Sequence, residues 1–96
     1  MTEYEVDASG VARFALEGEL DLATIEPLRS AVDRAVEAGA RHVVFDLRNV
    51  TFLDSSALAL FSRAAQRIEV TIEQPSDFVR RTIEITGLAS LLTVTP

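Results

Sequence analysis

The spacing of hydrophobic and polar residues changes along the chain, and each change marks a new element. Two short runs, Thr2–Asp7 and Val11–Leu20, flank a Ser-Gly turn signal. The second run alternates apolar and polar residues and places Phe14 and Leu16 on one face. A turn between two such runs is typical of a β-hairpin, so we expect the chain to open with two antiparallel strands.

Three later segments repeat apolar residues every three or four positions, as one face of an amphipathic helix requires. The first spans Thr24–Ala38, with Thr24 as the expected N-cap residue. The second begins at Ser55 or Ser56, and the third begins just after Pro75. These patterns predict three helices that each bury one side.

Runs with strand-like patterns separate and follow these helices. His42–Leu47 is mostly apolar without alternation, which is typical of a strand buried on both faces of a parallel sheet. Ile68–Glu73 alternates, and Leu91–Thr95 is a short terminal candidate. The order β-β-α-β-α-β-α-β predicts a small α/β sandwich, in which helices pack against a mixed β-sheet. A length of 96 residues suits one domain, spanning residues 1–96.

Composition excludes several classes of function. The chain has 15 acidic and 9 basic residues, and its net charge of −6 disfavours binding to nucleic acid or to an anionic membrane. It has no cysteine and one histidine, so we expect no cofactor and no cysteine or multi-histidine metal site. No run approaches the ~20 apolar residues of a membrane span, and the first residues do not look like a secretion signal. We therefore expect a cytoplasmic protein that is a monomer or a weak dimer.

The most informative polar run is Asp54-Ser55-Ser56, between a strand and a helix. Aspartate and serine are preferred N-cap residues, so capping alone accounts for at least one of the three. The outer face of the following helix carries small or polar side chains, which would let another protein approach the hydroxyl groups: Ala59, Ser62, Arg63 and Gln66. A phosphate here would add about −1.5 to −2 charge and would disturb a partner interface more than the domain itself.

Enzymatic readings of the same residues are weaker. A Ser-His-Asp hydrolase would need His42 about 3 Å from a serine, yet five residues of strand already separate His42 from that end of the sheet by ~17 Å. Asp21 and Asp54 could act as an acid/base pair or hold Mg²⁺, but nothing else in the sequence suggests a substrate pocket. We therefore expect a binding protein rather than an enzyme.

Four segments, in order along the chain, are similar to characteristic segments of one protein family. They are Leu16–Asp21, Val43–Val50, Asp54–Ala59, and the last helix with the Thr86-Gly87-Leu88 run that follows it. Together they resemble the STAS domain family, and in particular the bacterial anti-sigma factor antagonists. The resemblance implies that the unphosphorylated protein binds a serine-kinase anti-sigma factor and so releases a sigma factor. The kinase then phosphorylates a serine and ends binding, and a metal-dependent serine phosphatase removes the phosphate.

The resemblance also assigns roles to single residues. Ser56 matches the phosphorylated serine best, and Ser55 is the second candidate. The two acidic positions near that serine match Asp21 and Asp54. With the outer face of the helix included, the expected partner-binding residues are Asp21, Asp54, Ser55, Ser56, Ala57, Ala59, Ser62 and Arg63.

Two departures from the family pattern bear on function. Ala57 and Ala59 stand where glycines are usual, and each would add a methyl group where a partner docks. Arg67 runs almost directly into Ile68, so we expect the second helix to end early, near Ala64, or the fourth strand to shift. A second function therefore stays open, that of a non-switching STAS accessory subunit in a lipid-transport ABC complex or a signalling complex.

Overall fold

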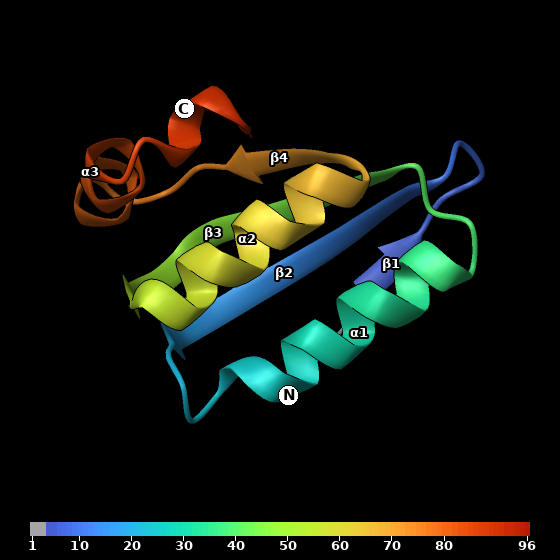
Figure 1. Cartoon of the computed structure of the whole chain (residues 1–96), viewed down its shortest axis with the longest axis horizontal. Coiled ribbons are helices and arrows are strands. Elements are labelled where there is room, and N and C mark those ends of the chain that lie inside the picture. Colours follow the sequence, from blue (N-terminus) through green and yellow to red (C-terminus); the bar gives the residue numbers. More distant parts are fainter. Residues whose placement is uncertain (1–3) are drawn as a thin grey trace.

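Within residues 4–96, five strands form a single mixed sheet in the order β1-β2-β3-β4-β5 (Figure 1). The computed structural model describes residues 4–96; residues 2 and 3 of the expected first strand lie outside them. β1 is antiparallel to β2, and every other neighbouring pair is parallel. The strands are β1 (Tyr4–Val6), β2 (Val11–Leu20), β3 (His42–Leu53), β4 (Glu69–Glu73) and β5 (Thr93–Val94).

Three α-helices connect the strands, in the order that the sequence predicts. They are α1 (Ile25–Glu37), α2 (Ser55–Arg67) and α3 (Asp77–Ile85). α2 lies in front of β2 and β3, and α1 runs alongside β2 on the side of β1, whereas α3 lies beyond the end of β4 (Figure 1). A short 3₁₀ helix, η1 (Leu88–Ser90), follows α3 and was not predicted.

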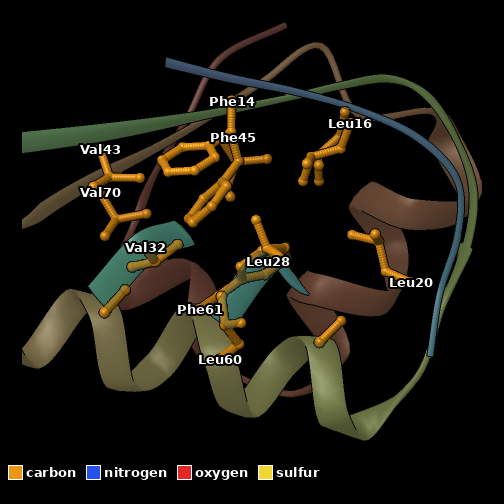
Figure 2. Packing of buried hydrophobic residues seen from close by; sticks show 14 of the residues in the cluster. Phe14, Leu16, Leu20, Leu28, Val32, Val43, Phe45, Leu60, Phe61 and Val70 are labelled. Carbon is orange, nitrogen blue, oxygen red and sulfur yellow. The ribbon is translucent and has the colours of Figure 1, made fainter. Parts of the chain in front are cut away.

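The hydrophobic core fills the space between the sheet and the helices α1 and α2, and it includes Val79 and Ile83 of α3 (Figure 2). Alternate residues of β2 and β3 face it, and Phe14 and Phe45 are fully buried with their ring centres 5.5 Å apart. Phe61 of α2 packs on Phe45 at a centroid distance of 4.9 Å. Because these tilted aromatic pairs join the sheet to α2, the helix is fixed in rotation as well as in position.

Strand β3 is longer than the predicted His42–Leu47. It continues to Leu53, and the pairing with β2 shifts at two places, where β3 carries one extra residue each time. These bulges keep Val50 and Leu53 on the buried face despite the change in spacing. The chain therefore leaves the strand at Asp54 and enters α2 with no intervening loop.

The expectation that the second helix ends near Ala64 is wrong. α2 runs through Arg67, and only Ile68 separates it from β4, which begins one residue later than predicted. No loop is needed because Ile68 already has extended geometry (φ −151°, ψ 172°), while its N–H still donates to the Ala64 carbonyl at 2.9 Å. Arg67 also forms an ion pair with Asp33 of α1 at 2.7 Å, so the last turn of α2 is held against its neighbour.

Candidate functional site

Asp54 organises the start of α2 and the loop that follows β2. Its Oδ1 accepts hydrogen bonds from the backbone N–H of Ser56 (2.8 Å) and Ala57 (3.4 Å), which makes it the N-cap of the helix. Its Oδ2 accepts from the N–H of Leu22 at 3.2 Å, and its own N–H donates to the carbonyl of Leu20 at 3.1 Å. One side chain therefore joins two segments that are about thirty residues apart in the sequence.

These contacts also fix the charge of Asp54. The Ser56 hydroxyl donates to Oδ1 at 2.5 Å, and this bond, with the backbone N–H groups, lowers the pKa of the Asp54 carboxyl below its ordinary value. Partial burial opposes the shift but does not reverse it. Asp54 is therefore a carboxylate at neutral pH, and a negative charge lies directly beside the two serines.

The loop between β2 and α1 is held by its own hydrogen bonds. Asp21 Oδ1 accepts from the N–H groups of Ala23 (3.0 Å) and Thr24 (3.1 Å). The Thr24 hydroxyl accepts from the Asp21 N–H and donates to the Glu19 carbonyl, both at 2.9 Å. Thr24 is the N-cap residue of α1, as predicted, but its side chain makes no cap bond because the hydroxyl is used inside the loop instead.

The two serines differ in their surroundings. Ser55 is the first residue of α2 and is exposed, whereas Ser56 is half-buried because its hydroxyl turns toward Asp54. Neither side chain is sealed in the core. A visiting protein could reach both positions from the outer side of the helix.

The outer face of α2 continues from these serines along the helix. Ala59 and Ser62 are half-buried, and Arg63 and Gln66 are exposed. Ala57 does not belong to this face: it is fully buried, since α2 turns it toward the sheet together with its other core residues. The expectation that Ala57 meets a partner, and adds a methyl group at the interface, is therefore wrong.

Two exposed apolar side chains flank the site and were not singled out in the sequence. Leu22, whose backbone N–H donates to the Asp54 carboxylate, is 77% exposed. Phe52, two residues before Asp54, is 40% exposed and stacks on Phe78 of α3 at 6.4 Å. The signal for these residues in the sequence was an apolar residue close to polar residues of a loop. A sequence alone does not show which of these apolar side chains stay outside the core.

The structure separates the residues of the hydrolase hypothesis. His42 and the serines lie at opposite ends of β3, and His42 Nε2 lies 2.7 Å from the Thr71 hydroxyl. Within residues 4–96, no three side chains of the metal-binding types come together. Over the same residues, no helix has the length and apolar character needed to cross a membrane.

The mixed sheet, the helices that cover it and the two serines where the central strand enters α2 together define an α/β domain of the STAS type. The chain belongs to the STAS domain family, whose model matches residues 6–96. This family consists of binding proteins without catalytic activity of their own.

Named relatives lie within the same family. The chain is similar to the anti-sigma-B factor antagonist of Staphylococcus aureus (strain NCTC 8325 / PS 47), with 34% identity over 82 residues, 80% of this chain and 76% of the relative. It is 30% identical over 92 residues to the anti-sigma-F factor antagonist RsfB of Mycobacterium tuberculosis, covering 92% of this chain and 75% of the relative. The crystal structure of an anti-sigma factor antagonist from Mycobacterium paratuberculosis superposes with a TM-score of 0.89 at 27% identity, covering 100% of this chain and 85% of that one.

Proposed function

We propose that this protein is a phosphorylation-switched anti-sigma factor antagonist. In its unphosphorylated form it binds a serine-kinase anti-sigma factor and thereby releases a sigma factor. The observation that carries the proposal is the display of Ser55 and Ser56 at the start of α2, beside the Asp54 carboxylate and on a face left free by the core. The names of the relatives at 30% and 34% identity support the same function.

The docking surface in this proposal combines the outer face of α2 with the loop after β2. Small side chains at Ala59 and Ser62 allow close approach, and Leu22 offers an apolar contact. The carboxylates of Asp21 and Asp54 are already bonded to backbone N–H groups, so we assign them to holding this surface in shape. Arg63 supplies a positive charge at the far end of the surface.

Phosphorylation of Ser56 would end binding through charge and bulk. Its hydroxyl oxygen lies 2.5 Å from Asp54 Oδ1, and the N–H groups that a phosphate would seek at a helix N-terminus are already occupied by that carboxylate. A group carrying about −1.5 to −2 charge would therefore turn outward, onto the docking surface. A serine phosphatase restores binding by removing it. In this role the protein acts in the cytoplasm, as a monomer or a weak dimer.

The test is to incubate the protein with ATP and a serine-kinase anti-sigma factor that binds it, and then to measure its intact mass. We expect one gain of ~80 Da, absent in Ser56→Ala and retained in the matched control Ser55→Ala. If the mass gain is lost in Ser55→Ala but kept in Ser56→Ala, the modified residue is Ser55. No gain with any kinase that binds the protein would contradict the switch and favour the non-switching accessory subunit.

A further inference from the structure

A groove of about 230 Å³ runs between α1 and α2, outside the serine site. Its apolar floor consists of Val32, Leu60 and Ala64, all of which are nearly buried. Its rim carries three arginines: Arg29, Arg63 and Arg67. The groove therefore combines an apolar floor with several guanidinium groups at its rim.

The charge of this groove is opposite to that of the molecule. Three of the 9 basic residues meet there with one lining carboxylate, Asp33, and with Glu26 paired to Arg29 at the rim, so the groove keeps an excess of positive charge although the chain as a whole has a net charge of −6. Guanidinium groups bind carboxylates and phosphates through paired hydrogen bonds. The groove is therefore suited to an anion that would be repelled over most of the surface.

The three arginines are not equally available. Arg67 pairs with Asp33 and Arg29 pairs with Glu26, each at 2.7 Å and each with both side chains at least 38% exposed. Such exposed ion pairs contribute little to stability, so an incoming carboxylate can share or replace them. Arg63 forms no ion pair with any of residues 4–96 and is exposed. It is the guanidinium that an incoming anion would meet first.

We propose that the groove between α1 and α2 binds an acidic segment of a partner protein, with a carboxylate on Arg63 and an apolar side chain over Leu60. A peptide segment fits better than a small metabolite, because the groove is open and smaller than the ~300–1,000 Å³ of ordinary ligand pockets. Arg63 and Ser62 also belong to the docking surface described above, so one partner can cover both. The inference rests on the proposed function for the nature of that partner, but its test does not use an anti-sigma factor.

The experiment is an NMR titration of the ¹⁵N-labelled full chain with the synthetic peptide acetyl-Glu-Leu-Glu-Glu-Leu-amide. We expect shifts at the backbone amides of Val32, Leu60 and Ala64, and an affinity at least ~10-fold lower in Arg63→Glu. The matched control is Arg34→Glu, which makes the same charge change on the exposed, opposite side of α1. It should change the affinity by less than about 2-fold.

Several outcomes would overturn the inference. The groove is not a peptide site if its amides do not shift, or if acetyl-Lys-Leu-Lys-Lys-Leu-amide shifts them equally. Equal losses of peptide affinity in Arg63→Glu and Arg34→Glu would show that the net charge of the protein alone attracts the peptide. Tighter binding of tripolyphosphate than of the acidic peptide would assign the groove to phosphate groups instead. A failed kinase assay together with specific peptide binding would contradict the proposed function while leaving the groove as a binding site.

Discussion

Two alanines that look equivalent in the sequence occupy opposite sides of α2, and enlarging each to leucine separates their roles. Ala57 has no exposed surface and lies within the core cluster, so its replacement by leucine must push three extra carbon atoms into filled space. Ala59 is half-buried on the outer face, where a longer side chain can extend into solvent. Both substitutions keep a good helix former, so helix propensity contributes almost nothing to the difference.

The expected magnitudes differ enough to be measured. Extra methylene groups in a packed core cost typically 1–3 kcal/mol, so Ala57→Leu should lower the free energy of unfolding by about that amount. For a domain of this size each kcal/mol corresponds to roughly 4–8 °C in Tm. Ala59→Leu should stay within about 0.5 kcal/mol of the parent protein, as most surface substitutions do.

Urea unfolding followed by far-ultraviolet circular dichroism would measure both variants. On the proposed function, Ala59→Leu should also weaken binding of the anti-sigma factor without loss of stability, since its side chain would stand on the docking surface. The reasoning is refuted if Ala57→Leu is as stable as the parent protein, or if Ala59→Leu is the more destabilised of the two.

Three further predictions concern the caps, the core and acid stability. Ser76→Ala removes the bond from the Val79 N–H to the Ser76 hydroxyl (3.2 Å) at the start of α3 and should cost about 1 kcal/mol, measured by urea unfolding. Phe61→Ala should cost about 3–5 kcal/mol in the same assay, because the ring is fully buried. The lowered pKa of Asp54 means that its contribution to stability is complete above the unfolded-state pKa and is lost as pH falls through the lower folded-state pKa. An acid titration followed by circular dichroism should therefore show a steeper loss of stability below about pH 4 in the parent protein than in Asp54→Asn.

Most of the fold follows from periodicity in the sequence. The strand and helix order was predictable because each segment buries one face, and the apolar spacing records which face that is. The end of α2 was not predictable in the same way. A helix normally needs a few residues to turn back toward a sheet, but Ile68 makes the change in one residue while its N–H still bonds to the helix. A change from helix to strand within one residue depends on backbone dihedral angles, which the pattern of side chains does not record.

The candidate site was predictable in outline and not in detail. Asp54 and the serines stand out as a polar run after a buried strand, but the bond from the Leu22 N–H to Asp54 depends on how two distant segments meet. The burial of Ala57 was open to prediction from helix spacing, because it lies three and four positions before the core residues Leu60 and Phe61. Because Ala57 stands where the family pattern has a glycine, the resemblance assigned it to the partner-binding side of the helix, whereas it lies on the buried side.

The free N–H groups at the start of α2 bind one negatively charged group within the fold, and the Asp54 carboxylate is that group. Its carboxylate accepts from two helix N–H groups, from the Ser56 hydroxyl and from the loop after β2, so few donors are left for a second negative group. On the proposed function, this occupancy explains why a phosphate on Ser56 acts on the partner rather than on the fold. The added charge cannot be absorbed at the helix terminus and must face outward, where the outer side of α2 and Leu22 are exposed. A site without Asp54 could draw the phosphate inward onto the helix, and the signal would then be partly hidden from the protein that has to sense it.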